Sequence, residues 1–503
     1  MFAKIFQPTC LPTRASFRPL FSIIILIFAF SSTLCQAATN TNTNINTNTN
    51  TNTNIKTKTI VTINNFSCPQ NCTCSPDDVH QKLSNSSLST YKVICERKKL
   101  AILPAVSDSE RVTYFSVYDN QIGRIDSMDT LPELLELKLS INQIDKIEPK
   151  AFENLSKLES LDLGFNSISD LPSGAFEGLN RLKKLILQRN SLRRLREDIF
   201  QNLSSLEELD LTGNLIRSLP DDIFRPCTRL QRLVLQSNRF HTLPDTIFHD
   251  NIHLSNIDIS YCEFGKVPID PLRGAEELSH LDISGNLMRT LDQDSFTGLN
   301  NLEFLLINDM KTLRTIGPYT FSSLCKLKRL HIYNNAFFDT LDKDAFHGMT
   351  ANGSCLNLED VDLHANQLST LHPRMLPICK IAKVDLRDNQ WRCDCTFRWV
   401  KSCRKNDPIH QQITCLEPLD VRNIEISNIA ADKFVCPSDQ TPFHREIRLF
   451  RLFVVSFGVL ILFFTLVMIV FYLHKIKLLR SHTNKYQRMG SIHYVKAPNE
   501  IIE

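Results

Sequence analysis

The apolar positions of this chain follow a pattern that fits neither one face of a helix nor simple alternation. In "LESLDLGFNSISDLP", residues 158–172, leucines stand at positions 158, 161 and 163, and an asparagine follows at position 166. In a short strand, Leu161 and Leu163 would point inward, and Asp162 between them would point outward. The pattern therefore predicts a short, half-buried strand that leads into a turn.

The same stretch recurs along the chain, with a step of 24 residues between Leu134 and Leu302. A unit of this kind cannot bury its apolar face alone, so its copies must stack on one another. A chain of 503 residues is therefore expected to form a solenoid rather than one compact core. Twelve copies begin at Val112, Leu134, Leu158, Leu182, Leu206, Leu230, Leu254, Leu278, Leu302, Leu327, Leu358 and Ile381.

The recurring asparagine is expected to be structural. The chain turns inside the stack, where backbone N–H and C=O groups still need partners, and an amide side chain offers both donors and an acceptor. The predicted asparagine ladder, interrupted at Cys262 and near Met310, comprises Asn120, Asn142, Asn166, Asn190, Asn214, Asn238, Asn286, Asn335, Asn366 and Asn389. A buried phenylalanine row is predicted on the opposite wall, at Phe152, Phe176, Phe200, Phe224, Phe248, Phe296, Phe321 and Phe346.

A repeat of this length that reads L-x-x-L-x-L-x-x-N/C-x-L resembles the leucine-rich-repeat family, and the resemblance covers residues 68–436. It implies an α/β fold: a leucine-rich-repeat solenoid of about twelve repeats, with a curved parallel sheet on its concave face. The repeats themselves would occupy residues 105–388. An open solenoid also needs caps at both ends.

Cysteines cluster where the repeats stop. By the same resemblance, residues 68–104 form an amino-terminal cap and residues 389–436 a carboxy-terminal cap, with the disulfide pairs Cys68–Cys74, Cys72–Cys95, Cys393–Cys415 and Cys395–Cys436. Two such clusters imply an oxidising compartment, which disfavours the alternative of zinc at Cys72 and Cys74. Cys227 and Cys262 are expected to be buried, inert thiols. The pairing of Cys325, Cys355, Cys379 and Cys403 stays open.

Both ends of the chain carry membrane-related segments. Residues 1–37 read as a cleavable signal peptide, with a short uncleaved anchor as the alternative, and residues 38–67 as a disordered Thr/Asn-rich leader. Residues 452–473 carry no charge and would span about 33 Å as a helix. With a stalk at 437–451 and a cytoplasmic tail at 474–503, this predicts a single-pass type I protein of the plasma membrane.

Glycosylation sequons and charge agree with an outward-facing repeat region. The sequons at Asn65, Asn85, Asn154, Asn202 and Asn352 all precede the apolar segment, whereas Asn71 is doubtful because Cys72 fills the middle position. The formal net charge is +3; residues 1–37 contribute +3 and residues 474–503 contribute +4, which leaves −4 for the residues between them. No basic stripe for nucleic acid is therefore expected.

No catalytic chemistry is predicted. The sequence has no H-E-x-x-H, G-x-S-x-G or phosphate-loop motif, so we expect neither an enzyme nor a metal or cofactor site. The aspartate that recurs in the strands, as at Asp162, Asp210 and Asp258, is interpreted as an ordinary outward residue.

The remaining candidates lie on the surface. Apolar and aromatic residues at outward strand positions form two hypothetical partner-binding clusters, because aromatic residues are enriched at binding hot spots. They are Tyr114 with Tyr118, and His280, Phe304, Leu306, His331 and Tyr333. The alternative is that imperfect repeats carry stray apolar residues. The sequence thus favours a surface glycoprotein that binds extracellular protein ligands in adhesion or as a receptor or co-receptor; the alternative is a structural or matrix-organising protein without signalling.

Overall fold

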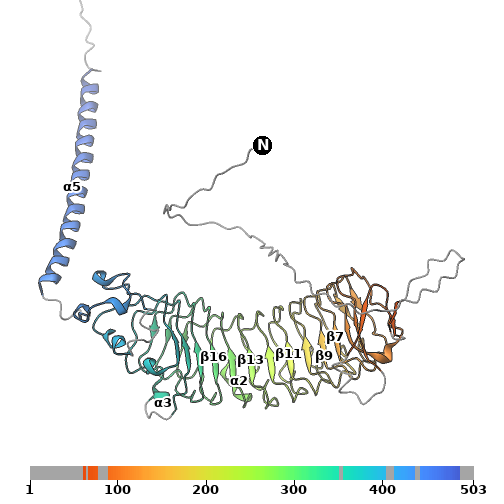
Figure 1. Ribbon diagram of the computed structural model, residues 1–503. Coiled ribbons are helices and arrows are strands. Elements are labelled where there is room, and N and C mark those ends of the chain that lie inside the picture. Colours follow the sequence, from red (N-terminus) through yellow and green to blue (C-terminus); the bar gives the residue numbers. More distant parts are fainter. Residues whose placement is uncertain are drawn as a thin grey trace, which may run out of the picture. The chain divides into compact units, whose positions relative to one another are not determined.

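The computed structural model describes residues 61–63, 66–77, 89–350, 355–403, 413–436 and 442–487. The predicted signal peptide, Asn65, Asn85, Asn352 and residues 488–503 lie outside these ranges. Twelve parallel strands, one per coil, form most of a 14-stranded sheet (Figure 1). They are β5 (Val112–Ser116), β7 (Glu136–Lys138), β9 (Ser160–Asp162), β10 (Lys184–Ile186), β11 (Glu208–Asp210), β12 (Arg232–Val234), β13 (Asn256–Asp258), β14 (His280–Asp282), β16 (Phe304–Leu306), β18 (Arg329–His331), β20 (Asp360–Asp362) and β21 (Lys383–Asp385).

Smaller elements lie at other places on the coils. Short strands pair as β6 (Arg124–Ile125) with β8 (Lys146–Ile147), and as β15 (Thr290–Leu291), β17 (Thr315–Ile316) and β19 (Thr340–Leu341). The helices of the coils are α2 (Ile269–Gly274) and α3 (His347–Thr350). Single 3₁₀ turns are η1 (Ser109–Arg111), η2 (Ile378–Lys380), η3 (Arg398–Ser402), η4 (Leu419–Val421), η5 (Ile426–Asn428) and η6 (Ala431–Lys433).

The amino-terminal end of the sheet is closed by β3 (Thr73–Pro76) and β4 (Tyr91–Ile94), which pair antiparallel, while β4 runs parallel to β5. A hairpin of β1 (Val61–Ile63) and β2 (Phe66–Cys68) precedes them. Phe66 is fully buried and stacks on Tyr91, with ring centroids 4.4 Å apart. The predicted leader boundary at residue 67 is therefore wrong, because an aromatic side chain before Cys68 already belongs to the core of the cap.

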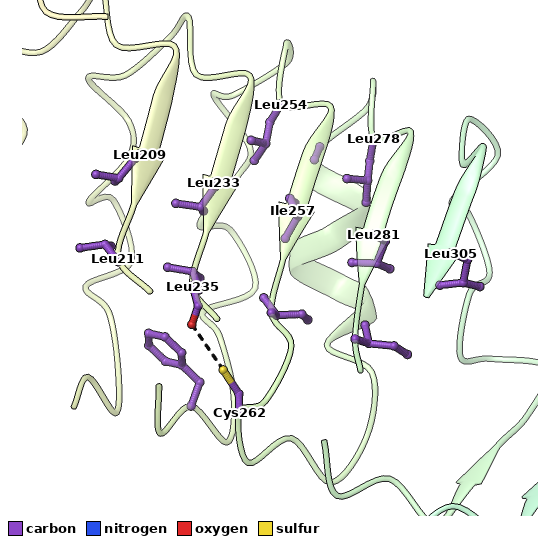
Figure 2. Packing of buried hydrophobic residues seen from close by; sticks show 14 of the residues in the cluster. Leu209, Leu211, Leu233, Leu235, Leu254, Ile257, Cys262, Leu278, Leu281 and Leu305 are labelled. Carbon is purple, nitrogen blue, oxygen red and sulfur yellow. Dashed lines mark hydrogen bonds between the residues drawn. The ribbon is translucent and has the colours of Figure 1, made fainter. Parts of the chain in front are cut away.

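The core consists of rows that run from coil to coil. The middle residue of each three-residue strand from β7 to β18 in this sheet faces inward, as Leu209, Leu233, Ile257, Leu281 and Leu305 do in Figure 2. The eight predicted phenylalanines are all buried. Their rings stack in succession, with centroids 6.0 Å apart for Phe200–Phe224 and 4.7 Å for Phe321–Phe346.

The asparagine side chains join each coil to the one before it. The Asn166 Nδ2 group donates to the carbonyl of Leu163 in its own coil (3.0 Å) and to that of Leu139 in the preceding coil (3.1 Å). Its Oδ1 accepts the backbone N–H of Ile144 (3.0 Å). The same set of contacts recurs, for example, at Asn190, Asn214 and Asn238. The ladder therefore satisfies the turn groups that the interior of the stack keeps from water.

The two irregular rungs have different causes. Cys262 replaces an asparagine, and its buried thiol donates weakly to the Leu235 carbonyl (Figure 2). Burial raises the pKa of this thiol to about 11 and that of Cys227 to about 12, so neither is a reactive thiolate. Met310 fills another rung with an apolar side chain, and its backbone N–H is accepted by Asn335 Oδ1, 25 residues later.

Within the described residues, six disulfides cross-link the caps and the last coils of the solenoid. Four of them are the pairs that the resemblance implied: Cys68–Cys74, Cys72–Cys95, Cys393–Cys415 and Cys395–Cys436. The structure also pairs Cys325 with Cys355 and Cys379 with Cys403, which the sequence left open. The second of these links the last coils to the carboxy-terminal cap.

Beyond the cap lies one long helix, α5 (Pro442–Gln487). Its stretch Phe450–Lys477 has a mean hydropathy of 2.9 and is, by length and composition, able to cross a membrane. The helix includes most of the region predicted as a juxtamembrane stalk and continues past residue 473.

We expect that replacing a ladder asparagine destabilises the solenoid far more than replacing an exposed one. Asn214→Ala leaves the buried N–H of Leu192 without a partner and removes one of the two donors to each of the Leu187 and Leu211 carbonyls, which should lower the free energy of unfolding by about 1–3 kcal/mol. Asn180→Ala, the same change at an exposed position two coils earlier, should cost less than about 0.5 kcal/mol. Denaturant unfolding of the two secreted ectodomains measures both, and equal losses would contradict the ladder.

Candidate binding site on the sheet face

The outward side chains of the twelve parallel strands form a continuous surface, here called the sheet face. The strands pair in register, so that residues 24 or 25 positions apart become lateral neighbours. One such row crosses five strands as His280, Phe304, Arg329, Asp360 and Lys383. Neighbouring strands are about 4.8 Å apart, so residues in a row can touch.

Phe304, a predicted hot-spot residue, is enclosed by its own row. The His280 ring stacks on it, with centroids 4.1 Å apart and planes 13° from parallel. The Arg329 guanidinium lies over the same ring at 5.1 Å. Because β14 and β18 flank β16 on opposite sides, both faces of the Phe304 ring are covered, and a partner could contact mainly its edge.

A hollow of about 210 Å³ opens beside this aromatic stack. Its walls mix the aromatic pair with aliphatic side chains and two carboxylates. The lining residues are Arg232, Leu233, Asn256, Ile257, Asp258, His280, Leu281, Asp282, Phe304 and Leu306. The hollow therefore contains three of the predicted site residues, His280, Phe304 and Leu306, together with charged groups that the sequence did not single out.

The two carboxylates of the hollow also shape the backbone. Asp258 Oδ1 accepts the backbone N–H of Ser260 (2.9 Å), and Asp282 Oδ1 accepts that of Ser284 (2.9 Å). The same turn contact occurs at Asp162, Asp210, Asp362 and Asp385. This aspartate faces outward, as interpreted from the sequence, but it also has a structural role. A short acidic side chain caps the turn that follows each of these strands.

The position of these carboxylates perturbs their ionisation. Burial raises the pKa of Asp258, although hydrogen bonds from Ser260 and the nearby Arg232 oppose this. Burial, together with the charges of Asp258 and Asp309, raises the pKa of Asp282 from 3.8 to about 6. A cation that enters the hollow would therefore stabilise the charged form of both carboxylates.

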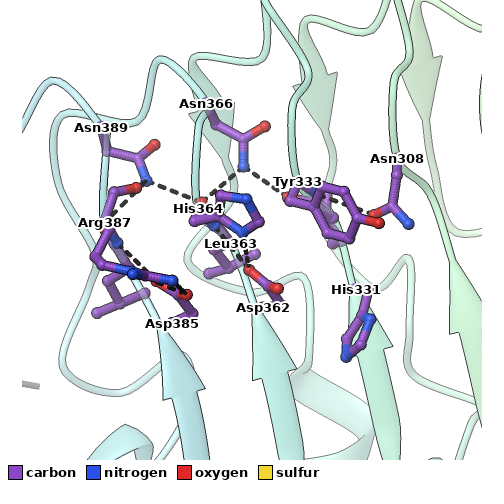
Figure 3. Close-up of polar contacts among 12 residues, drawn as sticks. Asn308, His331, Tyr333, Asp362, Leu363, His364, Asn366, Asp385, Arg387 and Asn389 are labelled. Carbon is purple, nitrogen blue, oxygen red and sulfur yellow. Dashed lines mark hydrogen bonds and ion pairs between the residues drawn. The ribbon is translucent and has the colours of Figure 1, made fainter. Parts of the chain in front are cut away.

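The second part of the predicted cluster lies further along the sheet (Figure 3). Tyr333 stacks on His364, with centroids 4.7 Å apart, and is 6.2 Å from the His331 ring. Phe304 and Tyr333, which the sequence analysis grouped in one cluster, thus each stack on a different histidine. The sequence did not indicate His364, because this residue and Tyr333 are 31 positions apart and an irregular coil lies between them.

His331 instead faces a nearly buried aspartate. Its Nε2 lies 3.4 Å from Asp360 Oδ1, and neither atom has a hydrogen-bond partner among the described residues. Arg329 Nε (3.3 Å) and Lys383 Nζ (3.0 Å) approach the other oxygen of Asp360. Burial alone would raise the pKa of Asp360, but the hydrogen bond from Lys383 and the charge of His331 lower it.

One group of described residues has the composition of a metal site. Donor atoms of Asp362, His364 and Asp385 lie within 4.8 Å of one another. Their capacity is already used, however, because His364 Nδ1 is 2.6 Å from Asp362 Oδ1 and Arg387 Nε contacts both oxygens of Asp385 at 3.0 and 3.1 Å (Figure 3). The arrangement is a set of surface ion pairs.

The other predicted cluster is divided in the same way. Tyr114 lies between Lys92 and Lys138, whose amines are 5.8 and 5.2 Å from its ring centroid. Tyr118 has the Arg97 guanidinium at 6.0 Å. Each tyrosine therefore carries a cation next to its ring, and the pair is less apolar than the sequence suggested.

The predicted glycosylation sites that the structure describes, Asn154 and Asn202, are exposed. Tyr261, which the sequence analysis did not single out, reaches across the next coil, and its hydroxyl donates to Asp309 Oδ2 at 2.5 Å. Gly285 lies beneath the ring: it has a positive φ, and a Cβ there would lie 2.4 Å from Tyr261 Cδ1. Only a glycine permits this contact at the rim of the sheet face.

Known proteins share the repeat and the fold. A leucine-rich-repeat family model matches residues 132–192, 180–240 and 252–311. A chain of the octameric complex of Latrophilin 3, Unc5D and FLRT2, in which FLRT2 contributes the leucine-rich repeats, is 21% identical; the match covers 74% of this chain and 100% of that chain, with a TM-score of 0.54. A leucine-rich-repeat protein of Leptospira interrogans is 22% identical over 61% and 74% of the two chains, with a TM-score of 0.49.

We expect the stability of the ectodomain to carry the signature of Asp282. Because the pKa of this carboxyl is raised on folding, the folded state binds the extra proton, and the contribution of Asp282 to stability falls as pH rises from about 4 to about 6. Asp282→Asn keeps an acceptor for Ser284 and removes the charge. It should therefore raise the free energy of unfolding at pH 7.5 by on the order of 1–2 kcal/mol and change it little at pH 4. Asp245→Asn, at an exposed position, controls for net charge, and an equal, pH-independent effect of both changes would refute this assignment.

Proposed function

Since the chain is a leucine-rich-repeat protein, we propose that it is a single-pass surface glycoprotein whose repeats bind an extracellular protein partner on the sheet face. The observation that carries this proposal is the hollow beside Phe304, where a stacked aromatic pair, aliphatic walls and two carboxylates converge. A concave site with mixed apolar and polar walls is the usual form of a recognition pocket. The complex that contains FLRT2 illustrates that a chain of this fold can assemble with other extracellular proteins.

The charge of the hollow supports a basic partner segment. Its two carboxylates lie on adjacent strands, in register, and each uses Oδ1 for its own turn, which leaves Oδ2 for another donor. The outward charges of β11 to β14 are Glu208, Asp210, Arg232, Asp258 and Asp282, four negative and one positive. An arginine or lysine of the partner would pair with Asp258 and Asp282, while its aliphatic stem packs on Leu306 and the edge of Phe304.

Three features together support the proposed location at the cell surface. Disulfide-stapled ends require an oxidising compartment, exposed sequons accompany them, and α5 contains a stretch that can cross a membrane. The protein would then act in adhesion or as a receptor or co-receptor, with the repeats outside. Binding rather than catalysis is proposed, because the charged groups of the sheet face are held in turns and ion pairs.

Loss of charge in the hollow should weaken partner binding without unfolding the coils. In the double variant Asp258→Asn, Asp282→Asn, both turn acceptors remain but the attraction for a cation is lost, so we expect at least a tenfold lower affinity. Binding of the multimerised ectodomain to cells that express its partner measures the effect. Asp162→Asn, the same change in β9, four strands from β13, should bind like wild type. Undiminished binding by the double variant would exclude the hollow as the site.

The proposed topology predicts opposite fates for two tags. A tag inserted after Ala38 should be removed by protease added to intact cells, because the repeats would lie outside. A tag at the carboxy terminus should be protected until the membrane is permeabilised. The reverse pattern would overturn the type I orientation.

A further inference from the structure

Six arginines gather in the turns that follow three adjacent strands, beside the sheet face. They lie in three consecutive turns, residues 189–196, 213–220 and 237–244, which follow β10, β11 and β12 and contain neither Asp nor Glu. All six side chains are exposed. This set, here called the arginine patch, comprises Arg189, Arg193, Arg194, Arg196, Arg217 and Arg239.

The stacking of the coils brings these residues together. The backbone N–H of Leu215 donates to the Leu192 carbonyl (2.8 Å), and that of Arg239 donates to the Ile216 carbonyl (2.9 Å). The three turns are therefore in direct backbone contact, although their arginines are up to 50 residues apart in sequence. Gly213 marks the closest approach: it has a positive φ, and a Cβ there would lie 2.9 Å from Arg189 Cδ, so the Arg189 side chain extends over the following coil.

The patch is poorly neutralised. Asp170, in the preceding coil, faces Arg194 at 3.9 Å and Arg196 at 3.6 Å. On the other side, Glu263 faces His241. Within the described part of the chain, the remaining four arginines form no ion pair. Like charges held this close repel one another, so the arrangement disfavours the folded chain unless an anion is bound.

The chemistry of the patch selects a polyanion. A guanidinium offers a planar fork of N–H donors that matches sulfate, phosphate and carboxylate oxygens, and all six cations here are arginine rather than lysine. Their line runs across successive coils, as a linear polymer with regularly spaced anionic groups would. The disulfides of the caps indicate an oxidising compartment, and in the proposed extracellular location sulfated polysaccharides rather than nucleic acids are the available polyanions.

We propose that the arginine patch is a binding site for a sulfated polysaccharide of the cell surface or matrix. The site is separate from the hollow on the sheet face, so the chain would hold a protein partner and a polysaccharide on different surfaces.

Binding to immobilised heparin tests the proposal, with the full-length protein in detergent micelles. The triple variant Arg193→Gln, Arg217→Gln, Arg239→Gln should bind at least tenfold more weakly than wild type in 0.15 M salt. The matched control Arg225→Gln, Arg273→Gln, Lys326→Gln removes three exposed cations outside the patch and should change affinity less than twofold. Both variants should melt within a few degrees of wild type.

Three outcomes would overturn the proposal: no heparin binding by the wild type, equal losses in the two triple variants, or equally tight, patch-dependent binding to phosphatidylserine vesicles, which would indicate a lipid surface instead. The hollow variant Asp258→Asn, Asp282→Asn should retain full heparin affinity. Loss of heparin binding in that variant would also count against a separate site, whereas its loss of protein binding alone concerns only the proposed function.

Discussion

Each coil of this protein turns through the interior of the stack, where its backbone N–H and C=O groups cannot reach water, and in all but the coils of Cys262 and Met310 one asparagine side chain supplies the missing partners. The contacts join residues of adjacent coils, so a rung forms where consecutive coils keep the same register, even when their lengths differ, as they do between Asn335 and Asn366. The 24-residue step, the alignment of the strands and the stacking of the phenylalanine rings all depend on this requirement.

The same requirement imposes strain beside each rung. The residue that precedes the ladder position has a positive φ in all twelve coils, as at Asp119, Gly213 and Asp388. Glycine and aspartate accept this conformation at low cost, but Ile141, Phe165 and Tyr261 also adopt it and remain partly exposed. Tyr261 gains a hydrogen bond to Asp309 in return. Ladder geometry thus overrides local preference.

Because the inward residues form the core and the ladder, the outward residues of the coils can differ without altering the fold, and they form two distinct surfaces. The sheet face carries the hollow with its aromatic pair and carboxylates, and the turn edge carries the arginine patch. These surfaces differ in charge and occupy different parts of the coils, since the hollow lies on strands β12 to β16 and the arginine patch lies in the turns that follow β10, β11 and β12. A repeat protein can in this way present separate binding chemistries without altering its core.

The sequence by itself determined the period, the inward leucines, the ladder asparagines, the cap cysteines and the apolar segment of α5, because each depends on spacing along the chain or on local composition. The tertiary structure decided which side chains meet between coils. It paired Phe304 with His280 and Tyr333 with His364, and it gave Asp282 its raised pKa. It also brought six arginines together, although residues 38–473 carry a negative net charge. Contacts between coils join residues 24 or more positions apart and depend on rotamer and register, which a linear pattern does not specify.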